Sequence, residues 1–163
     1  MSAKTTICSD LDKLAISYIE CYQEILFNRQ LLNDCLDDAY LNLSKARSLI
    51  GCNRLSLLQI PNEFDANLFV SHETDGHMVN EKLSYDKFSL VSTDDNEDVV
   101  VQTKLPNWFG VFTPLNLKTS QKSFFKSVNI ILNVCELQSK LNAIEIEYNN
   151  LLEKKTNILK LED

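Results

Sequence analysis

The sequence predicts a mainly α fold, in which long N- and C-terminal helices pair as an antiparallel coiled-coil hairpin around a small irregular or β insertion. Apolar residues recur at heptad spacing near both ends of the 163-residue chain. Glycine and proline occur only three times each, which favours long helices over a turn-rich fold. Short apolar stretches of strand character occur only in the middle. The length suits a single domain covering 1–163.

The first long helix is expected over about residues 9–51. Ser9 or Asp10 can act as its N-cap, and Gly51 suits a left-handed C-terminal stop. Arg29 interrupts an otherwise apolar heptad stripe, where it either sets the register or extends its stem into solvent. The stripe consists of Leu11, Ala15, Tyr18, Tyr22, Ile25, Arg29, Leu32, Leu36, Ala39, Leu43, Ala46 and Ile50, widened on one side by Ile19, Leu26 and Tyr40.

The second long helix is expected over about residues 114–161. Its stripe consists of Ile130, Val134, Leu137, Leu141, Ile144, Tyr148, Leu151, Lys155 and Ile158, widened by Ile131, Leu152 and Leu159. Each helix would be roughly 60 to 70 Å long at 1.5 Å per residue. Similar lengths allow one helix to fold back antiparallel on the other.

The middle segment, 52–113, has the least regular pattern. Short apolar stretches of strand character are found at 57–60, 68–70, 83–90 and 99–101. An acidic run at 94–98 predicts a solvated loop. We expect a small sheet of one or two hairpins, with mobile stretches around 72–82 and 92–98.

The charge and cysteine usage exclude several classes of function. A formal net charge of −7 disfavours binding to nucleic acid and direct docking on anionic lipid. No run of about 18 apolar residues is present, so we expect no direct membrane insertion. Five cysteines without a CxxC pair indicate a reducing compartment, and the polar start does not resemble a signal peptide. The chain is expected to face the cytosol.

The sequence offers no catalytic constellation. His72 and His77 flank Glu73 and Asp75, which is compatible with a metal site or with an exposed polar loop, but the spacing fits no zinc pattern. The cysteines lack a neighbouring base, so packing explains them better than nucleophilic catalysis. Phosphate-binding glycine motifs and a nucleophile elbow are absent. We therefore expect no enzyme activity, no cofactor, no metal and no catalytic residue.

The most informative segment is 105–114. It contains the only tryptophan of the chain, which lies between Pro106 and Pro114. The prolines prevent it from merging into the following helix. Its aromatics beside Gly110 either close the core at the end of the hairpin or anchor a partner. Phe27 and Leu41, opposite the heptad stripe, are similarly either single exposed apolar residues or part of a partner surface.

Residues 107–114, followed by Leu117, Gln121 and Phe124, resemble the signature of the coiled-coil domain-containing protein 115 family. Members carry a Trp-Phe-Gly-hydrophobic-x-x-Pro block, then a helix start of the form L-(R/K)-x-x-Q-x-x-F. Lys118 stands here where many members carry arginine. The end of the first helix, 43–51, also resembles the family's Leu-Ala-Lys-Ala-Arg ending before a glycine, with Ser44 in place of the commoner alanine.

The resemblance covers both helices and their order. It implies an assembly chaperone for the membrane sector of the vacuolar-type proton ATPase, peripheral on the cytosolic face of the endoplasmic reticulum. The implied partners are a small double-spanning membrane assembly factor of that compartment and, transiently, membrane-sector subunits. The family is also linked to the Golgi intermediate compartment, vesicles, the lysosome and lysosomal acidification. The residues expected to form the structural motif or bind a partner are Arg47, Gly51, Trp108, Phe109, Gly110, Pro114, Leu117, Gln121 and Phe124.

Two other classes of function fit the residues. A generic coiled-coil tether or scaffold would form a homodimer through both heptad stripes, and light scattering would distinguish it from a monomeric hairpin. An enzyme would need an unfamiliar site in the middle segment, which deletion of residues 72–98 would destroy.

Overall fold

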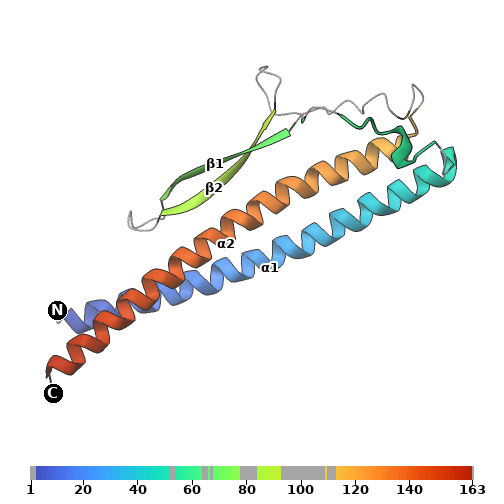
Figure 1. The fold of residues 1–163 in the computed structure, drawn as a ribbon. Helices are drawn as coiled ribbons and strands as arrows, with labels where there is room; N and C mark the ends of the chain where they lie inside the picture. Colours follow the sequence, from blue (N-terminus) through green and yellow to red (C-terminus); the bar gives the residue numbers. More distant parts are fainter. Residues whose placement is uncertain are drawn as a thin grey trace. The chain divides into compact units, whose positions relative to one another are not determined.

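A computed structural model describes residues 3–51, 54–63, 66, 68–77, 84–92, 109 and 113–162. In chain order its elements are α1 (Ala3–Ile50), the 3-10 helix η1 (Leu57–Gln59), β1 (Leu68–His77), β2 (Ser84–Ser92) and α2 (Leu115–Glu162) (Figure 1). β1 and β2 form a two-stranded antiparallel sheet. The predicted mainly α fold, with two long helices flanking a small β insertion, is confirmed.

Several predicted boundaries differ from the structure. α1 begins at Ala3, so Ser9 and Asp10 lie inside the helix and the predicted N-cap is wrong. Ile7 is half-buried one turn before Leu11, so the partly buried face of α1 extends beyond the predicted start of the helix. The predicted strand at 57–60 is wrong, because the 3-10 helix η1 occupies it.

In the insertion, residues 72–77 were expected to be mobile and instead continue β1. The predicted strands at 68–70 and 83–90 correspond to β1 and β2. The acidic run at 94–98 and the predicted strand at 99–101 lie outside the described residues.

The chain falls into two compact units. The first comprises Met1–Arg29, His72–Phe88 and Asn133–Asp163. Its core is formed by Cys21 and Ile25 of α1 with Leu137 and Ile144 of α2, and Leu14, Leu141 and Ala143 pack around it. The Cys21 thiol donates a hydrogen bond of 3.4 Å to the carbonyl oxygen of Leu137. Leu14 lies further toward the start of α1 and packs with later residues of α2, so the two segments run antiparallel.

The second unit comprises Gln30–Ser71 and Ser89–Leu132. Here the helices approach through small residues, because Ala39, Ala46, Ser120 and Ser127 are all at most 2% exposed. The Ser120 hydroxyl donates a hydrogen bond of 2.8 Å to the carbonyl oxygen of Ala39. Ala46 packs with Leu117 in the same unit, so these segments are antiparallel as well.

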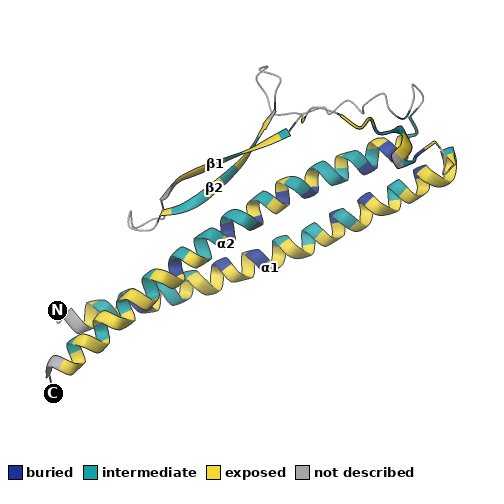
Figure 2. Cartoon of the chain, viewed as in Figure 1, coloured by how far each residue is buried: buried dark blue, intermediate teal, exposed yellow. Residues whose placement is uncertain are grey.

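The burial pattern departs from the predicted α1 stripe at Cys21 and Cys35. Figure 2 shows buried positions of α1 on the side that faces α2 within each unit. Cys21 and Cys35 are buried, whereas the predicted Tyr22 and Arg29 are exposed. A cysteine is small enough to fit where two helices approach closely, and the bulkier tyrosine lies at the edge. The buried residues of the predicted α2 stripe are Ile130, Val134, Leu137 and Ile144.

Candidate functional site

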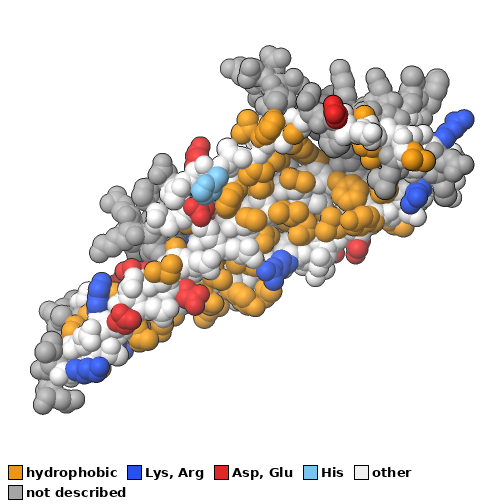
Figure 3. Space-filling view, viewed as in Figure 1, with side chains coloured by type: hydrophobic (Ala, Val, Ile, Leu, Met, Phe, Trp, Pro, Cys, Tyr) orange, Lys and Arg blue, Asp and Glu red, His pale blue; other side chains and the backbone are white. Residues whose placement is uncertain are grey.

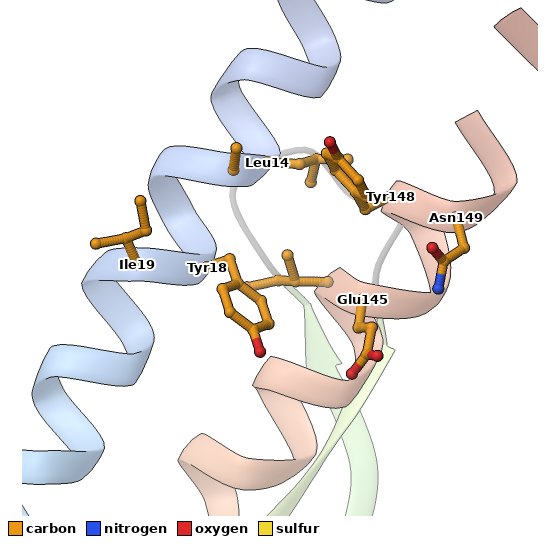
Figure 4. A pocket seen from close by; sticks show the side chains of 8 residues that line it. Leu14, Tyr18, Ile19, Glu145, Tyr148 and Asn149 are labelled. Carbon is orange, nitrogen blue, oxygen red and sulfur yellow. The ribbon is translucent and has the colours of Figure 1, made fainter. Parts of the chain in front are cut away.

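An open groove of about 370 Å³ lies between α1 and α2 in the first unit (Figure 4). Tyr18 and Tyr148 project into it from opposite helices. Its lining includes Ile144, which is 1% exposed, and Ile19, which is 56% exposed. The full lining is Leu14, Ala15, Tyr18 and Ile19 from α1, with Ile144, Glu145, Tyr148 and Asn149 from α2. A mainly apolar lining with one carboxylate suits an apolar side chain of a ligand better than polar chemistry.

The sheet is fastened to α2 within the same unit by a small polar network. The backbone amide of Asp86 donates to the Ser139 hydroxyl oxygen at 2.9 Å, and that hydroxyl lies 3.3 Å from the Asp86 carboxylate, to which it donates. The carboxylate also pairs with His72 at 3.0 Å, and the His72 ring lies 5.3 Å from that of Phe88. His72 was expected in a polar loop, and it lies instead on a strand with defined partners.

The same network resembles a nucleophilic triad in composition but not in connectivity. In a working triad the histidine contacts the serine, so that it can take the hydroxyl proton. Here Asp86 lies between the two: its carboxylate accepts from Ser139 and pairs with His72. The arrangement therefore fixes the hairpin on the helix and leaves the hydroxyl without an activating base.

Phe109 belongs to an apolar cluster at the ends of the helices in the second unit. It packs against the buried Ala46, Leu55 and Leu117, together with Leu43 and Ile50. The Trp-Phe-Gly segment thus contributes one ring to the core formed by the end of α1 and the start of α2. Trp108 and Gly110 lie outside the described residues.

The two helix ends have the stop and start signals that the sequence suggested. Gly51 has φ of 91°, and its amide donates to the Arg47 carbonyl oxygen at 3.0 Å. The Arg47 side chain is exposed. The Pro114 carbonyl accepts hydrogen bonds from the amides of Leu117 and Lys118, at 3.1 and 3.4 Å. Glycine is favoured at position 51, where φ is left-handed, because it lacks a Cβ.

Gln121 and Phe124 follow on the first turns of α2 and are both half-buried. The Phe124 ring meets the ring of Tyr40 edge to face, with centroids 5.2 Å apart. Nearby, the Ser123 hydroxyl donates to the Asp38 carboxylate at 2.9 Å. The structure thus brings Phe109 and Leu117 into one cluster and places Phe124 in a separate aromatic pair.

The described cysteines are free thiols, of which Cys21 and Cys35 are buried. Burial raises the pKa of the Cys21 thiol above its usual 9.0, while the Lys140 ammonium opposes this shift. A raised pKa keeps the sulfur protonated and poorly nucleophilic at neutral pH. No group of three or more His, Cys, Asp or Glu side chains lies together within the described ranges.

Several important residues were not anticipated from the sequence. Ser120 and Ser127 are buried polar residues between apolar helices, and Ser139 fastens the sheet. The spacing of Leu14, Cys21 and Cys35 was a usable signal, because the intervals of 7 and 14 residues are multiples of a heptad, with Asn28 at the position between the cysteines. The contact between Ser139 and Asp86 has no such signal, because it joins residues 53 positions apart.

Neither helix is long and apolar enough over its described residues to cross a bilayer.

No family model matches the chain. Sequence relatives include the vacuolar ATPase assembly protein VMA22 of Mus musculus, 22% identical over 151 residues that cover 82% of this chain and 84% of the relative. The Homo sapiens protein of the same name is 22% identical over 170 residues, covering 90% and 91%.

The Bos taurus protein of that name is 23% identical over 178 residues, covering 93% of this chain and 94% of the relative. These alignments extend over most of each chain, so the similarity is not confined to one heptad stretch. The chain is therefore similar over most of its length to the vacuolar ATPase assembly protein VMA22, in agreement with the resemblance that its Trp-Phe-Gly segment indicated.

Proposed function

We propose that the protein is an assembly factor for the vacuolar-type proton ATPase that acts by binding proteins and catalyses no reaction. It serves the membrane sector at the cytosolic face of the endoplasmic reticulum. A small double-spanning membrane assembly factor holds it there, and membrane-sector subunits bind it transiently. Its association with the membrane is peripheral, and its activity supports acidification of lysosomes and related vesicles.

The observation that carries this proposal is the agreement of the three relatives. All bear the same name, and each alignment covers at least 82% of this chain, a length that cannot be reached by one helix alone. Heptad repeats by themselves are common and would give partial matches to many unrelated coiled coils. Coverage of this extent supports a shared role.

The surface of the chain is consistent with protein binding. Large apolar side chains, including Ile19, Phe27 and Ile146, are more than half exposed on the described helices. On the face drawn in Figure 3, apolar side chains are exposed among charged ones along the helices. The net charge of −7 suits contact with basic cytosolic loops, and such contacts should weaken as salt concentration rises.

Gene deletion in the organism that encodes the chain tests this function. We expect loss of the assembled membrane sector on native gels and loss of organelle acidification, both restored by re-expression of the full chain. In membrane fractionation the chain should sediment with the endoplasmic reticulum. It should become soluble when the gene for its tether, the small double-spanning membrane assembly factor, is deleted. Normal assembly of the pump in the deletion strain would refute the proposed function.

The junction motif is proposed as the structural anchor between the insertion and α2. Trp108, Phe109, Gly110 and Pro114 form it, and Arg47 and Gln121 act beside it. In a Trp108→Ala variant that still folds, we expect co-precipitation of the tether to fall. Leu58→Ala is the matched control, because Leu58 is 96% exposed. Equal recovery of the tether with both variants would remove the anchor role.

A further inference from the structure

In the second unit, the region where α1 stops and α2 starts is rich in basic residues. Residues 39–62 and 99–135 contain none of the 23 aspartate and glutamate residues of the chain. Four cations of these two ranges are exposed around the junction of the helices: Lys45, Arg47, Arg54 and Lys118. Within the described part of the chain, none of the four pairs with a carboxylate. Charge is therefore segregated along a chain whose net charge is −7.

The four cations are gathered around the apolar cluster that joins the helix ends. Ala46, Leu55 and Leu117 are buried together in this cluster. Each of the four cations is the direct neighbour in sequence of one of these buried residues. At 1.5 Å per residue, Lys45 lies about 8 Å before the end of α1 and Lys118 about 5 Å after the start of α2. Long stems allow these side chains to bring their charges toward one surface.

The last acidic residue of α1 lies well before the end of the helix. It is Asp38, about 18 Å before Ile50 along the axis, and its carboxylate accepts a hydrogen bond of 2.9 Å from Ser123. At physiological salt, exposed charges are screened over about 8 Å. Glu63, four residues beyond η1, is the first acidic residue that follows, so four exposed cations leave this end positive. The expected repulsion from anionic lipid, which was based on the net charge, does not apply here.

Exposed leucines accompany two of the lysines. Leu49 is 70% exposed one turn after Lys45, and Leu115 is 76% exposed one turn before Lys118. Residues three or four positions apart share a helix face, so each leucine lies beside a lysine. On the face drawn in Figure 3, basic and apolar side chains lie together where α1 stops. Leucine beside lysine is typical of segments that lie in the membrane interface, where leucine enters the acyl layer and lysine reaches the phosphates.

We propose that this basic end docks on an anionic phospholipid surface. Its four cations pair with the lipid phosphates, while Leu49 and Leu115 enter the interface. A bilayer supplies both an anionic and an apolar layer, whereas nucleic acid supplies only phosphates. Lipid-binding clusters contain about four to eight basic residues, so this contact orients the chain on a membrane without holding it there alone. The inference goes beyond the proposed function, because lipid binding requires neither the pump nor another assembly factor.

Co-sedimentation of the full chain with protein-free vesicles tests the lipid contact. At low ionic strength, phosphatidylcholine vesicles with about one third phosphatidylserine should bind at least about tenfold more chain than phosphatidylcholine alone. Lys45→Glu with Lys118→Glu should weaken binding by about 25-fold or more, since each lysine contributes about fivefold. The matched control is Lys154→Glu with Lys160→Glu, which changes the net charge equally at exposed positions elsewhere and should weaken binding less than about threefold.

The leucines are tested separately. Leu49→Asn with Leu115→Asn should weaken vesicle binding several-fold, whereas Ile16→Asn with Phe27→Asn, at exposed positions of α1, should not. A benzophenone amino acid at position 115 should cross-link to lipid, and one at position 27 should not. Circular dichroism melts establish that each variant is folded.

Three results would overturn the lipid contact. They are equal binding to vesicles with and without phosphatidylserine, no binding to either, and equal losses from the lysine pair and its control. The second result is also the one expected if the basic end binds an acidic protein. Each of them would leave the proposed assembly role standing, because that role is refuted only by normal pump assembly after gene deletion.

Discussion

The hydroxyl of Ser120 donates a 2.8 Å hydrogen bond to the carbonyl oxygen of Ala39, and both residues are at most 1% exposed. A serine and an alanine at this contact allow the backbones of α1 and α2 to approach closely. A larger side chain at either position would separate the helices locally. The close approach thus depends on residue size as much as on apolar character.

Ser120→Leu should destabilise the protein by about 2 kcal/mol, because it overpacks the contact and removes the hydrogen bond. The measurement is the free energy of unfolding in urea, with Lys122→Leu at an exposed position of the same helix as control. For a single domain covering 1–163, the unfolding transition should remain cooperative. A loss below about 0.5 kcal/mol would contradict this account of the contact.

Truncation of a core side chain in the first unit should lower the free energy of unfolding by more than Ser120→Leu does. Ile144 is 1% exposed and Ile146 is 63% exposed on the same helix. Ile144→Ala should lower the free energy of unfolding by about 3 kcal/mol, because it leaves a cavity between α1 and α2. Ile146→Ala should change it by about 0.5 kcal/mol or less. Similar losses from both variants would show that Ile144 is not a core residue.

Gly51 should be required for its backbone conformation and not for space. An added Cβ meets nothing within 4 Å, but φ is 91°, which L residues rarely adopt. Gly51→Ala should therefore cost about 1 kcal/mol in denaturant unfolding. Gly51→Asn should cost less, because asparagine tolerates the left-handed region. If alanine and asparagine are both neutral, the left-handed stop is not formed in solution.

The hairpin should loosen when its polar contact with α2 is removed. Ser139→Ala eliminates the hydroxyl that accepts from the Asp86 amide and donates to its carboxylate. Loss of this contact should lower the free energy of local opening by about 1 kcal/mol. Hydrogen exchange of the Asp86 amide should therefore become roughly fivefold faster. Gln138→Ala, at an exposed neighbour, is the control. Unchanged protection of the amide would mean that the contact does not hold the hairpin.

The buried thiol should make stability fall at high pH. The pKa of Cys21 is raised in the folded protein. The protonated thiol therefore contributes fully to the free energy of unfolding below its pKa in the unfolded chain, which is about 9.0. Above that pH the unfolded chain loses the proton first, so the contribution is lost as the pH rises through the folded pKa. Unfolding free energies at pH 7 and pH 10 should therefore differ more for the wild type than for Cys21→Ala. A larger difference between pH 7 and pH 10 in Cys21→Ala than in the wild type would show that the thiol is not desolvated.

The heptad pattern was sufficient to predict both helices and most of the α2 core, since Ile130, Val134, Leu137 and Ile144 repeat at coiled-coil spacing. It was insufficient to fix which face of α1 is buried. Adjacent stripes through Cys21 and through Tyr22 are both apolar and lie about 100° apart, so hydrophobicity alone does not distinguish them. Residue size decides, because the smaller cysteine permits closer packing.

The candidate site was predicted only in part for a similar reason. Phe109 and Leu117 were identified through a motif close to the start of α2, and the structure places them in one cluster. The groove requires Tyr18 and Tyr148 to face each other across 130 positions, which depends on the relative register of two helices. A heptad repeat does not specify that register, because each shift by seven residues preserves the pattern.

Affinity purification of the tagged full chain from its own organism, in mild detergent, tests the central claim most directly. Quantitative mass spectrometry should recover membrane-sector subunits of the vacuolar-type ATPase and a double-spanning membrane assembly factor, at least tenfold above an unrelated tagged coiled coil. Catalytic-sector subunits should stay at background, since the proposed role is confined to the membrane sector. Background levels of membrane-sector subunits, or equal recovery of both sectors, would contradict an assembly role.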